Sequence, residues 1–166
     1  MGRLSKELYN VQNPALGAYI LAKFSLGYSS ELDKGVPLPL TFIILPMIYK
    51  TEIMDVIYST QRRSGLRNFA EKFVDNKLKK NDLLLQINGL SQRGKIMTLE
   101  AIRVGITAEI IAVENNGCIL PLEDRIKSFK IYTTELNKMA KAAEKLGAWC
   151  SELSLLEISQ VLKVRF

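Results

Sequence analysis

The chain has 166 residues, enough for one domain with a sizeable core, and its composition is 48% apolar and 24% charged. It contains no histidine, which excludes Ser-His-Asp triads, Cys–His pairs and His-ligated metal sites, and its net charge of +6 fits an anionic partner. No paired acidic motif, Gly-rich phosphate loop or G-x-S-x-G sequence supports catalysis by other residue types. We therefore expect a single domain over residues 1–166, with an N-terminal extension at 1–12, that has no enzymatic activity and binds no metal or cofactor.

No segment of the sequence resembles a leader or a membrane anchor. The first ten residues are charged and are not followed by an apolar core with a cleavage site. The most apolar run, PLPLTFIILPMIY, is too short to span a bilayer and contains Pro46. Cys118 and Cys150 are far apart without metal-like spacing, so we expect two buried thiols in a reducing compartment. These features predict a cytoplasmic protein with no membrane contact.

The first firm helix is predicted from the segment NPALGAYILAKFSLGY. Asn13 suits the N-cap, Pro14 the first helical position, and Gly27 the left-handed residue just past the helix end. The following residues 38–49 are apolar on every side, and we prefer a helix here to the alternative, a buried strand over 40–45. A segment without a polar side must be covered all round, either by this domain or by another chain.

The sequence becomes basic after residue 50, since residues 51–97 hold nine Lys and Arg against five Asp and Glu. The spacing predicts a helix whose buried side contains Leu66, Phe69, Phe73 and Val74. The cations that fall on other sides are Arg62, Arg63, Arg67, Lys77, Lys79 and Lys80. Among them, Arg62, Arg63 and Arg67 are our candidates for contact with an anionic partner or with nucleic acid. An ordinary solvated face is an equally good interpretation.

Residues 81–122 contain, in order, the elements of a winged helix. The predicted elements are a helix from Asn81 or Asp82 to Ile87, a turn over 89–94, and a second helix from an N-cap at Thr98 to about Glu109. Asn116-Gly117 then predicts a hairpin with a type I′ turn, in which both central residues have positive φ. A helical domain with an inserted hairpin would give the same pattern. We assign the chain to the mainly α class (α+β), with a winged-helix-like segment over 81–122.

The second of these helices is a poor candidate for reading DNA bases. It carries one cation, Arg103, beside Glu100 and Glu109, and is otherwise apolar. Helices that read base edges in the major groove present Arg, Lys, Asn or Gln on a positive face. This helix is therefore better suited to contact protein.

The C-terminal helical segment, residues 133–166, ends without a polar tail. A long helix is predicted over about Thr133–Cys150, and the S-x-x-E capping box of Ser154 opens a last helix. Termini are usually polar and frayed unless they dock against something, so the final apolar residues need either a groove of this fold or a partner. The residues that we predict to bind a partner are Trp149, Leu162, Val164 and Phe166.

Five segments together resemble one known family, the middle components of bacterial three-component ABC systems, which include the Lamassu type of anti-phage operon. The segments are NPALGAYILAKFSLGY, GVPLPLTFIILPMIYK, STQRRSGLRNFAEKF, TLEAIRVGITAEIIAVENNGCILPL and KAAEKLGAWCSELSLLEISQVLKVRF. The resemblance covers residues 10–166 and rests on structural motifs, none of which is catalytic.

The resemblance implies a non-catalytic adaptor that bridges an SMC-like ABC ATPase and an effector subunit, often a nuclease. It implies no individual binding residues, so the candidates above rest on the sequence pattern alone. The alternative is a DNA-binding winged-helix protein, either a regulator or a nucleoid-associated factor. The charge of +6 favours that alternative, and the acid-flanked second helix opposes it.

Overall fold

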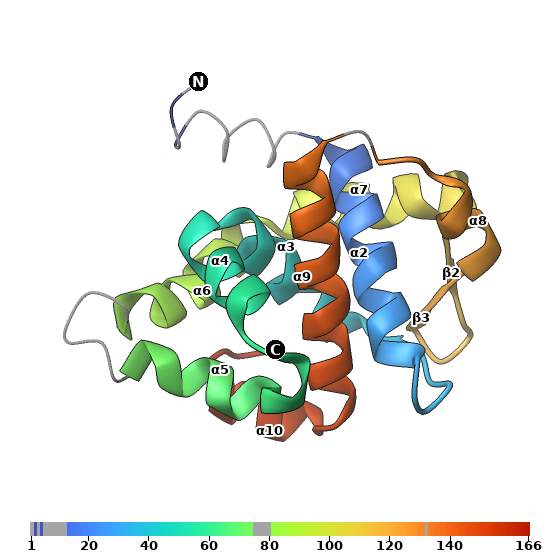
Figure 1. The fold of residues 1–166 in the computed structure, drawn as a ribbon. Coiled ribbons are helices and arrows are strands. Elements are labelled where there is room, and N and C mark those ends of the chain that lie inside the picture. The colour runs from blue at the N-terminus through green and yellow to red at the C-terminus, as the bar shows by residue number, and fades with distance from the viewer. Residues whose placement is uncertain (1, 3, 5–12, 75–80, 132) are drawn as a thin grey trace.

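The computed structural model describes residues 13–74, 81–131 and 133–166, together with Gly2 and Leu4. In these ranges the chain is mainly helical with one small antiparallel sheet, as predicted (Figure 1). Most of the predicted extension 1–12 lies outside the described residues, as do Lys77, Lys79 and Lys80. The elements are α2 (Pro14–Ser29), β1 (Val36–Pro37), α3 (Leu38–Tyr49), α4 (Thr51–Ser59), the 3-10 helix η1 (Arg62–Ser64), α5 (Gly65–Val74), α6 (Asn81–Arg93), α7 (Lys95–Thr107), β2 (Ile111–Val113), β3 (Cys118–Pro121), α8 (Glu123–Ser128), α9 (Thr134–Ser151) and α10 (Leu155–Leu162).

Helix α2 begins where the sequence predicts, but it ends later. The Asn13 side chain accepts a hydrogen bond from the backbone N–H of Leu16 at 3.1 Å, so the predicted N-cap is confirmed. The prediction for Gly27 is wrong, because this residue lies inside α2 and not past its end. A Cβ atom on Gly27 would stand 1.8 Å from the carbonyl oxygen of Glu144 in α9. Gly27 therefore serves the close approach of two helices and not a reversal of the chain.

Helices α2 and α9 lie side by side at the centre of the fold, with the other elements around them (Figure 1). On the α9 side the close approach occurs at Gly147, where a Cβ atom would stand 2.1 Å from the carbonyl oxygen of Phe24. Phe24 of α2 and Leu146 of α9, the sequence neighbours of these contacts, are fully buried. The glycines bring the two backbones together, and the burial of such apolar side chains stabilises the fold around them.

The apolar segment 38–49 forms helix α3, so the alternative of a strand is wrong. Most of its side chains are buried against α2, α6, α7 and α9. The exposed residues, Leu38 and Pro39, lie at its N-terminal end. This domain thus covers most of the segment itself and leaves one end of it open to solvent.

The sheet contains the predicted hairpin and one strand that the sequence does not predict. Strands β2 and β3 pair antiparallel, and β1 joins β3 on its other side, giving the order β1-β3-β2. The predicted type I′ turn is wrong, because Gly117 alone among residues 114–117 has positive φ, 79°. Its N–H donates to the carbonyl oxygen of Glu114 at 2.9 Å, the pattern of a type I turn followed by a left-handed glycine. Strand β1 is two residues long and contains Pro37, which suits only an edge strand.

Helices α6 and α7 differ from the predicted pair in their boundaries and their packing. Helix α6 continues to Arg93 through the region predicted as a turn, and only Gly94 separates it from α7, which begins at Lys95. Helix α6 packs mainly on α3 and α5, whereas α7 packs mainly on α2. Residues 81–122 therefore share their core with the rest of the chain, and the winged-helix interpretation of this segment stays a prediction.

The capping box at the start of α10 is confirmed. The Ser154 hydroxyl accepts from the backbone N–H of Glu157 at 3.2 Å, and the Glu157 carboxylate accepts from the backbone N–H of Ser154 at 2.9 Å. The backbone N–H and the hydroxyl of Ser154 both donate to the Glu157 carboxylate, and these two bonds lower its pKa. The helix ends at Lys163, whose φ of 55° places it in the left-handed region. The turn directs the last residues back along the fold.

A lysine side chain of α9 binds main-chain carbonyl groups at the C-terminal end of α4. The Lys145 ammonium donates to the carbonyl oxygens of Ile57, Tyr58 and Thr60 at 3.2, 2.7 and 2.6 Å. The last carbonyl groups of a helix lack partners within that helix and carry its negative dipole end, so a cation here is favourable. Partial burial lowers the pKa of Lys145.

Candidate partner-binding surfaces

Three of the four residues predicted to bind a partner lie in the core of this chain. Trp149 is fully buried, its indole N–H donates to the carbonyl oxygen of Arg62 at 2.6 Å, and its ring lies 5.7 Å from that of Phe69. Leu162 and Val164 are also buried. Packing within the chain accounts for the burial of all three, and Phe166 is the exposed member of the four. The binding of a partner by these residues stays a prediction.

The end of the chain is held by backbone hydrogen bonds around Ser159. The N–H of Val164 donates to the carbonyl oxygen of Ser159 at 3.1 Å, and the Ser159 hydroxyl donates to the carbonyl oxygen of Val164 at 2.7 Å. The N–H of Arg165 donates to the side-chain oxygen of Asn88 at 3.3 Å. Only after these contacts does Phe166 reach the surface, where 47% of it is exposed.

Phe166 lies at a groove of about 280 Å³, here named the terminal groove. The groove is lined by Leu38, Pro39, Phe42, Ile43, Ser91, Gln92, Lys95, Arg165 and Phe166. It brings together the apolar segment 38–49 and the C-terminal residues. These are the two segments for which the sequence predicts burial either by this domain or by a partner. Within the described ranges, neither Lys95 nor Arg165 has an ion-pair partner, so the groove combines an apolar surface with a positive rim.

Helix α7, which begins at Lys95 of this groove, has an exposed apolar side. Ile96, Leu99 and Ile106 are 78%, 52% and 45% exposed, and we name these three residues the α7 outer stripe. They fall on one helical face because their spacing is three and seven residues. Arg103 lies between them, and its guanidinium donates to the Glu100 carboxylate at 2.9 and 3.0 Å. The cation that lies among the stripe residues is thus neutralised, which favours protein over DNA as the partner of the stripe.

The predicted contacts to an anionic partner are exposed, but each has a neighbour that competes for it. Arg67 forms an ion pair with Glu157 at 3.0 Å, and Arg62 forms a longer one with Glu31 at 3.7 Å. Arg63 donates to the side-chain oxygen of Gln61 at 2.7 Å. The structure therefore does not gather these arginines into one bare positive patch, and their role as anion contacts stays a prediction.

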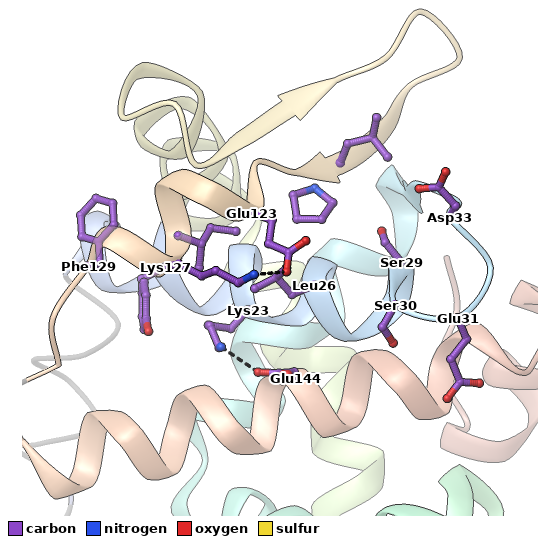
Figure 2. A pocket seen from close by; sticks show the side chains of 14 residues that line it. Lys23, Leu26, Ser29, Ser30, Glu31, Asp33, Glu123, Lys127, Phe129 and Glu144 are labelled. Atoms are coloured by element: carbon purple, nitrogen blue, oxygen red, sulfur yellow. Dashed lines mark ion pairs between the residues drawn. The ribbon is translucent and has the colours of Figure 1, made fainter.

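A second groove of about 810 Å³, here named the lateral groove, runs along α2 between α8 and α9 (Figure 2). Its walls carry two ion pairs, Lys23 with Glu144 at 2.7 Å and Lys127 with Glu123 at 2.6 Å. The full lining is Tyr19, Lys23, Leu26, Ser29, Ser30, Glu31, Asp33, Leu120, Pro121, Glu123, Ile126, Lys127, Phe129 and Glu144. None of these residues was a candidate from the sequence. The groove is formed by two charged connections, SSELDKGVP and EDRIKSFK, and no local pattern indicates that they meet.

The pKa values in the lateral groove follow its ion pairs and its burial. The hydrogen bond from Lys127 lowers the pKa of Glu123, so this carboxylate stays ionised. Burial, and secondly the charge of Glu144, raise the pKa of Tyr19, so its hydroxyl stays protonated. The ionised carboxylate of Glu123 and the neutral hydroxyl of Tyr19 are therefore both stable near neutral pH.

The two cysteines differ in their surroundings. Burial raises the pKa of the Cys150 thiol, which keeps it protonated and a poor nucleophile. Cys118 is only partly buried, which corrects the expectation of two buried thiols. Among the described residues, no group of three or more Cys, Asp or Glu side chains could hold a metal ion.

No helix in the described ranges combines the length and the hydropathy that crossing a bilayer requires.

Comparison with known proteins identifies one family for this chain. No curated protein and no solved structure matches the chain. The family model for Middle Component 3 of ABC-three component (ABC-3C) systems matches residues 1–166, which is the whole sequence. This match confirms the resemblance to middle components that the five segments indicated. The chain belongs to the Middle Component 3 family of ABC-three component systems.

Proposed function

We propose that this middle component is a non-catalytic adaptor in a cytoplasmic anti-phage defence complex of the Lamassu type. It bridges an SMC-like ABC ATPase and an effector subunit of the nuclease type. The observation that carries the proposal is the α7 outer stripe, Ile96, Leu99 and Ile106, which is apolar and has no covering element among the described residues. Family membership supports the proposal because a component of a three-component system needs surfaces for the other components.

The α7 outer stripe has the anatomy of a protein interface. Binding energy in such interfaces comes mainly from buried aromatic and aliphatic anchors, and charged residues lie at the rim. If a partner covered them fully, Ile96, at 78% exposure, would contribute roughly 1 to 2 kcal/mol, and Leu99 and Ile106, at about half exposure, roughly 1 kcal/mol each. Lys95, at the start of α7, lies at one end of the stripe and supplies the rim there. Phe166, at the terminal groove that Lys95 also lines, supplies an aromatic anchor.

The test is co-expression of the tagged chain with the products of its neighbouring genes, followed by affinity purification and mass measurement. We expect the wild-type chain to retain an ABC ATPase, and the double substitution Leu99→Glu with Ile106→Glu to release it. Leu156→Glu is the matched control, since Leu156 is an exposed leucine on α10, away from the stripe. Circular dichroism should show equal helicity in all three proteins. Retention of every component by the stripe variant would refute this assignment of the interface.

A second function, DNA binding by a winged helix, is favoured by one observation. Strand β1 pairs with β3 of the hairpin, so α2, β1, α3, α7, β2 and β3 follow the order of elements in a winged helix, with α4 to α6 inserted. The unit proposed under this function therefore differs from the predicted segment 81–122. Against it stand the apolar outer stripe and the neutralised Arg103 on the helix in the reading position.

Duplex binding by the isolated chain separates the two functions. A DNA-binding protein should lose affinity steeply as salt rises, because phosphate contacts release counterions. Replacing Arg62, Arg63 and Arg67 with glutamine should then weaken binding and reduce the salt slope by about one unit for each phosphate that an arginine no longer neutralises. Weak binding that ignores these substitutions would remove the second function.

A further inference from the structure

The lateral groove is a second candidate surface, independent of the terminal groove and the α7 outer stripe. It shares no lining residue with either of them. In Figure 2, α2 forms the floor, Glu123 and Lys127 of α8 stand on one side, and Glu144 of α9 stands on the other. Phe129 lies at one end, and Glu31 and Asp33 lie at the opposite end. The groove thus has an aromatic end and an acidic end.

The lateral groove is lined by more acidic than basic residues, so some of its carboxylates are not paired with a lysine of the groove. Its lining contains four acids, Glu31, Asp33, Glu123 and Glu144, and two lysines, a balance of −2 in a chain of +6. Both lysines are already paired, Lys23 with Glu144 and Lys127 with Glu123. Among the described residues, the one ion pair of Glu31 is the long contact of 3.7 Å to Arg62, in which both side chains are more than half exposed. The acidic end can therefore accept cations from outside.

The rest of the groove is suited to apolar side chains. Leu26, Leu120 and Ile126 contribute to its lining. Phe129 is 49% exposed, although its ring centroid lies 6.4 Å from that of Tyr19. A partner that covers an aromatic ring of this kind gains energy from both apolar burial and aromatic contact.

We propose that the lateral groove binds a segment of another component of the system, in which an apolar residue packs towards Phe129 and a Lys or Arg reaches Glu31 and Asp33. The inference rests on the proposed adaptor function and extends it by giving the chemistry of a second partner. The terminal groove carries the opposite charge, through Lys95 and Arg165. Two grooves of opposite sign select differently charged segments and suppress exchange between them, because like charges repel at close contact.

The first experiment is photo-cross-linking in the full complex. We would replace Phe129 with p-benzoylphenylalanine in one protein and Phe166 in another, and then map the cross-linked peptides by mass spectrometry. We expect the label at 129 to join a component through a peptide that contains Lys or Arg near its apolar residue. A peptide rich in acids, or none, would overturn the lateral-groove inference. If the label at 166 alone forms a cross-link, the adaptor function stands without this groove. If neither forms one although the complex assembles, the lateral-groove inference falls and the adaptor function stands on the α7 outer stripe; if no complex assembles, the adaptor function falls as well.

The second experiment tests the charge at the acidic end. Glu31→Lys with Asp33→Asn adds three positive charges, and asparagine suits the left-handed backbone of residue 33, whose φ is 46°. We expect the affinity for the cross-linked component to fall by about tenfold in dilute salt, and the difference to shrink at about 0.5 M salt. The matched control, Glu71→Lys with Glu152→Gln, makes the same charge change at exposed residues outside the groove. An equal loss in this control would attribute the effect to net charge and would overturn the proposal.

Discussion

Replacing Gly147 with alanine should show how strongly the fold depends on the close approach of α2 and α9. The new Cβ would stand 2.1 Å from the carbonyl oxygen of Phe24 and 2.8 Å from the backbone nitrogen of Tyr28. Real Cβ contacts essentially never fall below 3.0 Å, so the two backbones must separate by at least 0.9 Å at this point. Neither atom belongs to a side chain that could rotate away. The helices themselves must move.

The expected loss follows from that movement. Overpacking of a core costs about 1 to 3 kcal/mol, and a gap of about 1 Å forfeits a quarter to a half of the dispersion energy of each contact along the crossing. Alanine recovers about 1 kcal/mol through its higher helix propensity. The lost dispersion energy offsets this gain, so we expect the free energy of unfolding to fall by about 1 to 3 kcal/mol for Gly147→Ala.

Urea unfolding, followed by the fluorescence of Trp149, the only tryptophan, measures this loss. Gly89→Ala is the matched control, because this glycine also lies inside a helix, α6, but its Cβ would meet nothing closer than the Arg93 guanidinium at 3.7 Å. The control should gain about 0.5 to 1 kcal/mol. A Gly147→Ala protein as stable as the wild type would refute the packing argument.

Three further predictions concern stability. Tyr49→Phe removes a buried hydroxyl that has no hydrogen-bond partner in the described part of the chain, so thermal unfolding should show equal or higher stability, by up to about 1 kcal/mol; a clear loss would reveal a missed partner. Leu162→Ala should cost about 2 to 5 kcal/mol in urea unfolding, whereas Phe166→Ala should cost less than about 1 kcal/mol; equal losses would place Phe166 in the core. The pKa of Glu157 lies below its ordinary value of 4.5 in the folded chain, so its stabilising effect is complete above that pH and is lost as pH falls through the folded pKa. In Glu157→Gln the melting temperature should depend less on pH below about 5, and an unchanged acid slope would contradict the capping box as its source.

The features that the sequence predicts well are local. The Asn13 cap of α2 and the Ser154–Glu157 box of α10 each need residues only three positions apart, and both occur in the structure. The hairpin is predicted for the same reason, since Asn116-Gly117 marks a turn whatever surrounds it. The exact turn type is not predicted, because a type I turn with a following glycine uses the same two residues.

The features that the sequence predicts poorly depend on contacts between residues that are distant in the sequence. Gly27 resembles a helix end until α9 is placed against it. Trp149 and Val164 resemble exposed anchors until the core that covers them is assembled. The lateral groove requires Asp33 and Phe129 to belong to one surface, although almost a hundred residues separate them. Hydrophobic periodicity and capping motifs are local, so they do not predict such long-range tertiary contacts.

The contacts by which α9 holds the end of α4 have a consequence for how this protein can diversify. Lys145 binds the carbonyl oxygens of residues 57, 58 and 60, and Trp149 binds that of Arg62, so all four bonds are made to main-chain atoms. Every amino acid offers the same carbonyl group. The path of this segment is therefore set by α9. Its exposed side chains, at residues 58, 59 and 61–63, can vary without changing these bonds, whereas Thr60 is buried and hydrogen-bonded through its own side chain.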